Sequence, residues 1–187
     1  AARRPAALMA ADDYRVTVAR LKYGGGGDWY ADPSSLPNFL REFERRTGIP
    51  TASSEKVIEP GDPALASYPF LYMTGHGNVS FTPGELEKLR SHLLEGGFLW
   101  ADDNYGMDES FRKAVAKLFP GRELAAVPLD HPIYSCFYEL PGPPKIHEHD
   151  GQRPEGLGVF EDDRLMLFYT YEIDVGGGLE YPDVHGD

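Results

Sequence analysis

Residues 70–103 read FLYMTGHGNVSFTPGELEKLRSHLLEGGFLWADD, and this stretch decides the fold class. The runs at 70–74 and 98–101 are short and continuously apolar, which is typical of strands buried on both faces of a parallel sheet. Between them, TPGE at 82–85 is a capping box with proline at the first helical position, so a helix begins there. Two glycines at 96–97 end that helix. A strand, a helix and a strand in this order predict a parallel sheet covered by helices.

The preceding and following segments continue the same alternation. Residues 14–21 alternate in polarity and are rich in β-branched side chains, which indicates a first strand. A helical pattern follows at 36–43 and is ended by Gly48 and Pro50, and residues 52–58 predict a modest second strand. Residues 111–119 predict another helix, and 123–127 another strand. Each helix pattern presents one apolar stripe, as expected of a helix that packs on a sheet.

The pattern changes in the C-terminal third, beyond Pro128. Loop-forming residues dominate at 141–144 and 151–158, and one hairpin is predicted from 158 to 171 with an Asp162-Asp163 turn. We expect one α/β domain over residues 14–187, three-layered, with a mostly parallel sheet and an elaborated C-terminal third. Residues 1–13 are expected to be a disordered leader or a recombinant remnant, and the domain to lack a terminal helix and strand.

Composition excludes several functional classes. The 187 residues are 41 % hydrophobic, enough for a sizeable core, and carry a formal charge of −12. A nucleic-acid partner is not expected, because phosphate binding requires clustered positive charge. No apolar run approaches the about 20 residues that span a bilayer. Cys136 is the single cysteine, so no internal disulfide exists, and its apolar neighbours predict a buried, unreactive thiol.

Three polar, glycine-rich segments follow the predicted strands, at 24–29, 75–78 and 102–106. Ligands of open parallel sheets bind outside the carboxyl ends of the strands, where these segments should meet. The glycines at 24–27 lack the Gly-Lys-Ser/Thr of a phosphate loop, so a flexible turn is favoured over phosphate binding. Trp29 either covers a pocket or belongs to the core.

His76 and the carboxylates at 102–103 are the catalytic candidates. A histidine at a strand's carboxyl end serves as a general base, a ligand anchor or a metal ligand, or it bonds only to its own loop. Asp102 and Asp103 bind a cation, raise each other's pKa, or cap the next helix together with Asn104. Neighbouring side chains of an extended segment point to opposite faces, so only one of the two aspartates should face a cleft.

Histidines in the loop-rich region suggest a metal. His147 and His149 form a His-x-His pair, which places both rings on one face if the segment is a strand. No third ligand is fixed by spacing, and His76, His131, His185 or an aspartate would have to supply it. A divalent metal is the one cofactor that this pattern suggests, against the alternative of a solvated loop.

Several of these motifs together resemble the bacterial domain-of-unknown-function family 4159. The resemblance lies in residues 20–30 (RLKYGGGGDWY), in 70–77, in 89–103, in DHPI at 130–133 and in DRLMLFYT at 163–170. It extends over about residues 14 to 187. It implies a flavodoxin-like fold of the class I glutamine amidotransferase-like superfamily. It also implies an extracytoplasmic or periplasmic location with possible proximity to a membrane, and it implies no specific activity.

The resemblance also exposes a departure from the glutaminases of that superfamily. In those enzymes a Gly-Gly-hydrophobic strand leads to a nucleophilic cysteine, whereas here Gly96-Gly97 and the strand lead to Asp102-Asp103-Asn104. A carboxylate is a much poorer nucleophile towards an amide than a thiolate. The resemblance therefore favours a fold that has lost this mechanism.

Three functional hypotheses remain open from the sequence. The first is a non-catalytic domain that binds a small polar or saccharide-like ligand, or a partner protein. The second is a hydrolase that uses a metal or a carboxylate–histidine pair, with His76 and Asp103 as catalytic residues and His147 and His149 as metal ligands. The third is a structural interaction domain. The predicted ligand-binding residues are Gly25, Trp29, Gly75, His76, Asp102, Asn104, Tyr105 and His131.

Overall fold

The computed structural model describes residues 15–147 and 151–180, which form a mixed α/β fold. The strands are β1 (Ala19–Leu21), β2 (Lys56–Ile58), β3 (Phe70–Met73), β4 (Phe98–Asp102), β5 (Ala125–Ala126), β6 (Glu155–Glu161) and β7 (Arg164–Tyr171). The helices are α1 (Ser35–Thr47), α2 (Pro83–Leu94), α3 (Asp108–Leu118) and α4 (Val175–Gly178), with short 3-10 turns η2 (Pro63–Ser67) and η3 (Pro132–Tyr134). The leader expected at residues 1–13 lies outside the described residues.

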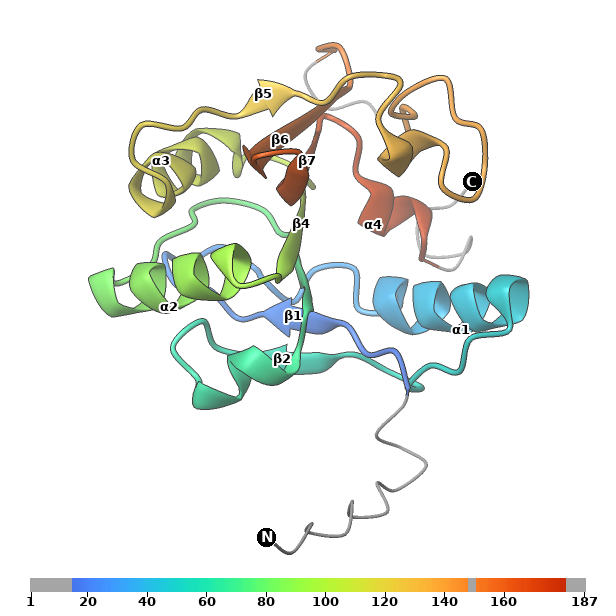
Figure 1. Ribbon diagram of the computed structural model, residues 1–187, viewed down its shortest axis with the longest axis horizontal. Coiled ribbons are helices and arrows are strands. Elements are labelled where there is room, and N and C mark those ends of the chain that lie inside the picture. Colours follow the sequence, from blue (N-terminus) through green and yellow to red (C-terminus); the bar gives the residue numbers. More distant parts are fainter. Residues whose placement is uncertain (1–14, 148–150, 181–187) are drawn as a thin grey trace, which may run out of the picture.

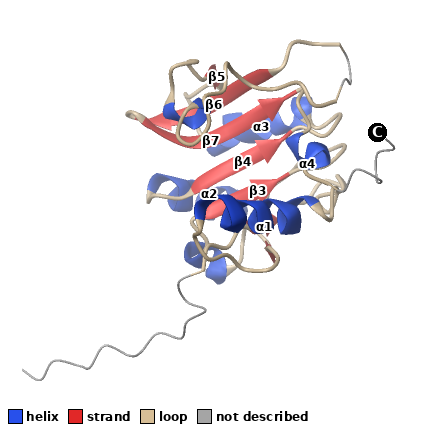
Figure 2. Cartoon of the chain, turned by 90° about the vertical axis from the view of Figure 1, so that its right-hand side faces the viewer, coloured by secondary structure: helices blue, strands red, loops and turns tan. Residues whose placement is uncertain are grey.

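One seven-stranded sheet runs through the molecule in the order β2-β1-β3-β4-β7-β6-β5. The first five strands in this order are parallel, and β6 and β5 add antiparallel pairings at one edge. Figure 2 shows β3, β4, β7, β6 and β5 side by side behind α1 and α4. The predicted α/β class with a mostly parallel sheet is confirmed.

Helices cover both faces of the sheet (Figure 1). The α1 and α4 helices lie on one face, and α2 and α3 on the other. Successive residues of a strand contribute side chains to two different cores, one on each face of the sheet. On one face, Leu71, Leu99 and Leu167 pack towards α2 and α3. On the opposite face, Tyr72 packs with Leu36 and Leu40 of α1. This alternation decides on which side each polar residue beyond a strand end will lie.

The helix limits agree with the sequence signals. The capping box of α2 is present: Thr82 accepts from the Glu85 N–H, and the Glu85 carboxylate accepts from the Thr82 N–H at 2.7 Å. Gly48 ends α1 with a φ of 73°, a conformation that glycine adopts without strain. The predicted hairpin is also confirmed as β6 and β7, joined at Asp162-Asp163.

The first two strands are shorter than predicted. From residues 14–21 only Ala19–Leu21 forms β1, and from 52–58 only Lys56–Ile58 forms β2. Val16 and Thr51 make an isolated parallel bridge, so the two segments touch again nearer the amino ends. Between this bridge and the three-residue ladder of β1 with β2 the two segments are not continuously paired, so both strands are short.

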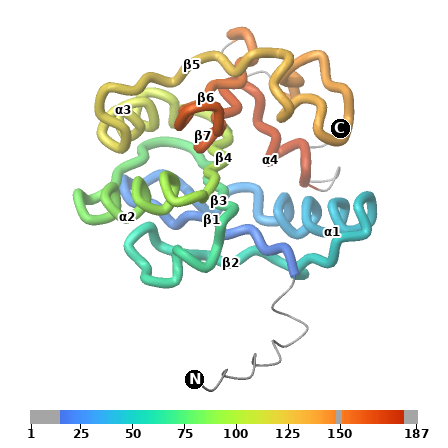
Figure 3. The backbone as a smooth tube through the Cα atoms, viewed as in Figure 1, coloured from blue at the N-terminus to red at the C-terminus, as the bar shows by residue number. Residues whose placement is uncertain are grey.

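The segment between β5 and β6 returns across the sheet. Figure 3 follows the chain from β5 to the side of α1 and α4 and back to β6. Tyr134 of η3 packs against Phe168 of β7 on that side, with ring centroids 6.2 Å apart. The C-terminal third therefore extends the sheet and also covers part of the α1 face.

Candidate functional site

Four connections meet beyond the carboxyl ends of β1, β3, β4 and β7, as the parallel order requires. The glycine loop after β1 pairs through its backbone with the loop after β3. Gly27 N–H donates to Asn78 O at 3.0 Å, and Gly24 and Ser80 exchange two hydrogen bonds. A Cβ on Gly25 would lie 2.8 Å from Asn78 O, so glycine is required for this close approach. The four glycines thus serve loop–loop packing.

His76 forms a pair with Asp28 that the sequence analysis did not find. Nδ1 of His76 lies 2.9 Å from Asp28 Oδ2, and the His76 backbone N–H donates to Asp28 Oδ1. The two side chains are 49 % and 33 % exposed. With Nδ1–H held by the carboxylate, Nε2 is the basic nitrogen. The preceding Gly75 has a φ of 142°, and a Cβ there would lie 2.9 Å from Asp28 O.

Tyr105 and Asn104 join this pair from the loop after β4. His76 and Tyr105 form a parallel bridge that extends the pairing of β3 with β4, and Tyr105 is 47 % exposed. Asn104 is buried and donates through Nδ2 to Asp32 Oδ2 at 3.1 Å. The structure thus brings three predicted residues, His76, Asn104 and Tyr105, to one edge.

Asp102 is fully buried on the α1 and α4 side of the sheet. Its Oδ1 accepts from Val175 N–H at 3.1 Å and from the Thr170 hydroxyl, and its Oδ2 from Gly176 N–H at 2.5 Å. Burial raises the pKa of this carboxyl to about 7, and the hydrogen bonds oppose the rise. Asp102 therefore anchors the start of α4, and it does not cap α3, whose N-cap is Met107.

Asp103 points to the opposite face, as alternation predicted. Its Oδ2 accepts from Glu172 N–H at 3.5 Å, while Oδ1 is buried without a donor among the described residues. The nearby Tyr169 hydroxyl donates to Asp108 Oδ1 at 3.1 Å. Burial raises the pKa of Asp103 to about 6, and the charge of Asp108 adds to the rise. The sheet separates the two aspartates, so they do not form a joint site.

Asp32 is a second residue that the sequence analysis did not identify. Asp32 has a φ of 53°. The buried Arg20 holds this part of the backbone, because its guanidinium donates to the Asp32 carbonyl at 3.1 Å and to Ala31 O at 2.6 Å. Burial raises the pKa of the Asp32 carboxyl to about 6, with the charges of Asp174 and Glu180 adding. Arg20 and His76 oppose this rise.

Signals for Asp28 and Asp32 exist in the sequence but are weak. Both residues lie in the connection after the first strand, at the edge where ligands of such sheets bind. Their pairing with His76 and Asn104 spans about 50 to 70 positions, and no local spacing encodes contacts of that separation.

Trp29 belongs partly to the core. It is half-buried, packs against the cluster under α2 and α3, and meets Tyr30 edge-on at 5.5 Å. Its carbonyl accepts from Arg20 at 3.4 Å. Tyr30, at 63 % exposure, is the more accessible ring of the two.

The remaining histidines are separated by the fold. His131 caps η3, where its Nδ1 accepts from Ile133 N–H at 3.1 Å, and its ring lies against Phe160. Phe160 pairs with Leu165 near the start of β7, so His131 lies at the amino end of the parallel strands, away from His76. His147 lies beyond the other end of β7, with Nε2 3.9 Å from Asp174 Oδ2.

The predicted metal ligands are only partly described. His149 and His185 lie outside the described residues. Within 15–147 and 151–180, no group of three or more His, Cys, Asp or Glu side chains is arranged to hold a metal ion. His147 near Asp174 is the one part of the predicted set that the structure places, so the metal stays a prediction.

Cys136 corrects an expectation. The apolar neighbours predicted a buried thiol, but the structure places Cys136 at the surface, as a free cysteine. The reason is local: it follows η3, and the neighbouring Phe137 and Tyr138 are also exposed. An apolar run in a loop lacks the periodic partner surface that buries a strand or a helix.

The edge as a whole is rich in carboxylates. Asp28 and Asp32 come from the connection after β1, and Glu172 and Asp174 from the connection after β7, where Lys145 faces Glu172 at 3.3 Å. Asp32, Glu172 and Asp174 are buried, whereas the Asp28 carboxylate is 33 % exposed and can accept hydrogen bonds from hydroxyl or ammonium groups. The summed negative charge of the edge repels anions. The His76–Asp28 pair adds a half-exposed group that can take up a proton.

Comparison with known proteins gives a family but no activity. No curated protein is similar enough in sequence to match the chain. In the described part of the chain, every helix is too short or too polar to cross a membrane. Residues 17–187 match the model of the family described as a domain of unknown function, DUF4159, and the chain therefore belongs to that family.

Proposed function

We propose that this protein binds a small polar ligand at the carboxyl edge of its sheet and performs no reaction on it. The observation that carries the proposal is the accessible His76–Asp28 pair beside Tyr105. The ligand class follows from the chemistry of the edge: carboxylates accept hydrogen bonds from hydroxyls, and an exposed aromatic ring packs on an apolar ligand face. A saccharide-like or other polyhydroxylated molecule, neutral or cationic, has these properties.

The state of Asp102 and Asp103 supports the absence of catalysis. In the proposed amidotransferase-like ancestry, the residues after β4 stand where a nucleophile is needed. Asp102 has no exposed surface and uses both carboxylate oxygens to hold α4. Asp103 is 3 % exposed and lies on the other face. A ligand at the edge therefore meets neither carboxylate directly.

The fold and the location belong to the same proposal. The parallel strand order β2-β1-β3-β4-β7 corresponds to the 2-1-3-4-5 order of flavodoxin-like folds, which supports a flavodoxin-like or amidotransferase-like ancestry. An extracytoplasmic location is proposed on the family resemblance alone. Fractionation of cells that produce the full-length protein tests it.

The test is ligand-observed NMR with monosaccharides, disaccharides and amino sugars. Wild-type protein should bind at least one of them, and His76→Ala and Tyr105→Ala should each abolish the signal. Tyr138→Ala is the matched control for Tyr105→Ala, because both rings are about half-exposed and Tyr138 lies on another face. The variants' melting temperatures should stay near that of the wild type. Failure of every compound, or binding that survives both edge variants, contradicts the proposal.

A second candidate is a hydrolase, favoured by one contact. The 2.9 Å approach of Asp28 Oδ2 to His76 Nδ1 is the geometry in which a carboxylate orients a histidine for general-base activation of water. The wild-type protein should hydrolyse an ester, amide or glycoside substrate. The rate of this hydrolysis should fall at least about 100-fold in His76→Ala. Asp28→Asn should lower the rate too. Equal rates in wild type and His76→Ala would assign any turnover to a contaminant.

A further inference from the structure

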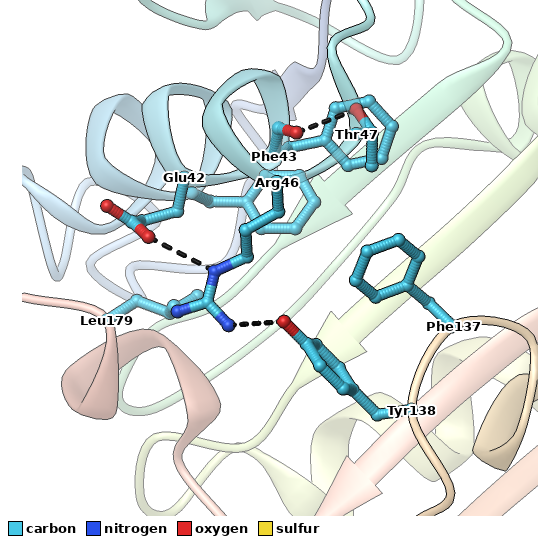
Figure 4. A pocket seen from close by; sticks show the side chains of 8 residues that line it. Glu42, Phe43, Arg46, Thr47, Phe137, Tyr138 and Leu179 are labelled. Atoms are coloured by element: carbon cyan, nitrogen blue, oxygen red, sulfur yellow. Dashed lines mark hydrogen bonds and ion pairs between the residues drawn. The ribbon is translucent and has the colours of Figure 1, made fainter.

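A cavity lies away from the carboxyl edge. It has a volume of about 370 Å³, within the range of small-molecule pockets. Helix α1 forms one wall, and residues 137–138 of the segment after η3 form the other (Figure 4). The lining residues are Phe39, Glu42, Phe43, Arg46, Thr47, Phe137, Tyr138 and Leu179.

The direction of α1 separates this cavity from the proposed ligand site. The helix connects two parallel strands, β1 and β2, so it must run antiparallel to them. Its first residue, Ser35, lies at the carboxyl edge, and its C-terminal half with Phe43 and Arg46 lies towards the amino ends of the strands. The two sites can therefore be tested independently.

The walls of the cavity are apolar and accessible. Phe39 and Phe43 are neighbours along α1, with tilted rings whose centroids are 6.1 Å apart, and Phe137 and Tyr138 meet edge-on at 4.7 Å. Phe137 is 56 % exposed. Exposed aromatic side chains around a concave surface lose unfavourable contact with water when an apolar group fills it.

The polar side chains that line the cavity offer a ligand hydrogen-bond donors but few acceptors. The Thr47 hydroxyl is used, since it donates to Phe43 O at 2.7 Å. Arg46 donates from Nε to Glu42 at 3.1 Å and from Nη1 to the Tyr138 hydroxyl at 2.7 Å, as Figure 4 shows. Arg46 Nη2 donates to no described residue, and the Tyr138 hydroxyl, as an acceptor here, keeps its own hydrogen. Two donors are therefore available.

The charge at the rim of the cavity favours a negatively charged ligand. Glu42 faces two guanidinium groups, those of Arg45 and Arg46, so one positive charge is unbalanced at the rim of the cavity. This occurs in a chain whose formal charge is −12. The Glu42 and Tyr138 contacts also hold the guanidinium in place, which lowers the entropy lost when it binds a ligand.

We propose that this cavity binds a small amphipathic organic anion, an aryl or medium-length alkyl carboxylate. Its apolar part packs against Phe39, Phe43 and Phe137. Its carboxylate accepts hydrogen bonds from Arg46 Nη2 and from the Tyr138 hydroxyl. The site is separate from the carboxyl edge, whose carboxylates repel such a ligand.

The probes are three compounds with one apolar body: 4-phenylbutyrate, 4-phenylbutan-1-ol and 4-phenylbutylamine. Titration calorimetry or protein-observed NMR on the whole chain measures their affinities. The anion should bind most tightly, the alcohol less tightly and the amine most weakly. We expect a dissociation constant of about 1 mM or tighter for the anion, the range of a ligand of this size. The amine should bind roughly tenfold more weakly than the anion.

Arg46→Met and Arg45→Met form a matched pair. Both arginines contact Glu42, but only Arg46 lines the cavity. Arg46→Met should weaken binding of the anion by roughly three- to tenfold, because the interaction that it removes is electrostatic. The affinity for the alcohol should stay unchanged. Arg45→Met should keep the wild-type order. Phe137→Ser, at a half-exposed loop position, should weaken all three compounds.

Three results would overturn the proposal. They are the absence of binding by the anion, equal binding of all three compounds, and an anion affinity that Arg46→Met leaves intact. Self-association that Phe137→Ser abolishes, without anion binding, would assign the cavity to a second copy.

Discussion

Asp102 and Asp103 are adjacent in sequence and have different environments. The Asp102 carboxylate accepts from two backbone N–H groups and from the hydroxyls of Thr170 and Tyr72, whereas one oxygen of Asp103 is buried without a donor among the described residues. Burial raises the pKa of both, which means that each negative charge costs folding free energy. The rise is larger at Asp102, to about 7 against about 6, but Asp103 has fewer hydrogen bonds to lose when its charge is removed.

Asp103→Asn is therefore expected to stabilise the protein at pH 8. The amide removes the buried charge, still accepts from Glu172 N–H, and can donate to the Tyr169 hydroxyl. The gain should be about 1 to 2 kcal/mol at pH 8 and should vanish near pH 4, where the native carboxyl is already protonated. Urea unfolding at the two pH values measures it. A loss of stability at pH 8 would contradict this expectation and show that hydrogen bonds to the charged form, such as that of the Tyr169 hydroxyl, outweigh the cost of burial.

At the scale of elements, the connections position the site more than the strands do. The glycine loop and the loop after β3 pair through backbone hydrogen bonds, and this pairing brings Asp28 to His76. A side chain on the glycine loop would push the two loops apart at some positions and project into open space at others. Gly25 and Gly26 illustrate the two cases.

Gly25→Ala and Gly26→Ala separate close packing from backbone strain. Both glycines have positive φ, 105° and 88°, so both alanine variants carry strain of about 1 kcal/mol. Only the Gly25 Cβ meets backbone, at 2.8 Å from Asn78 O and from Ser80 N, whereas nothing lies within 4 Å at Gly26. Thermal unfolding should show the larger loss for Gly25→Ala, by at least about 1 kcal/mol. Equal losses would mean that the loops are not paired in solution.

On the scale of the whole molecule, three buried carboxyls set the pH dependence of stability. Burial raises the pKa of Asp32 and Asp103 to about 6 and that of Asp102 to about 7, from 3.8. A raised pKa in the folded state means that the unfolded chain binds fewer protons between these values. Stability must therefore fall as pH rises through that window.

We expect the melting temperature to decrease from pH 5 to pH 8. The half-exposed Glu42, whose pKa the Arg45 and Arg46 hydrogen bonds lower to about 2, loses its contribution only at much lower pH. Burial lowers the pKa of His92, so this one group opposes the trend of the three carboxyls below pH 6.5. Calorimetry in buffers of equal ionic strength tests this expectation. Asp103→Asn should flatten the profile, and a melting temperature that rises over the same range would contradict the pKa directions.

Metal binding is testable at the same scale. If His147 and His149 bind a divalent metal, the purified protein should contain about one equivalent of it, and a chelator should lower the melting temperature. Double substitution of His147 and His149 by alanine should remove both effects. If the purified protein contains no metal and neither zinc nor a chelator changes its melting temperature, the hypothesis of a metal-dependent hydrolase is wrong.

Local signals explain how much of the fold the sequence predicted. The Thr82–Glu85 capping box, the Gly48 stop and the apolar runs at 70–74 and 98–101 act within a few residues, and the elements formed there. Strand alternation also placed Asp102 and Asp103 on opposite faces. The surface position of Cys136 was missed, because burial in a loop depends on what packs over it.

The sequence by itself determined the α/β class, the helix limits and the edge at which polar loops gather, because capping, periodicity and parallel order are local or topological properties. Tertiary structure alone decided the pairing of His76 with Asp28, the anchoring of α4 by Asp102 and the cavity between α1 and Tyr138. These contacts join residues about 50 to 95 positions apart. Their geometry follows from how the loops pack, which no short-range pattern encodes.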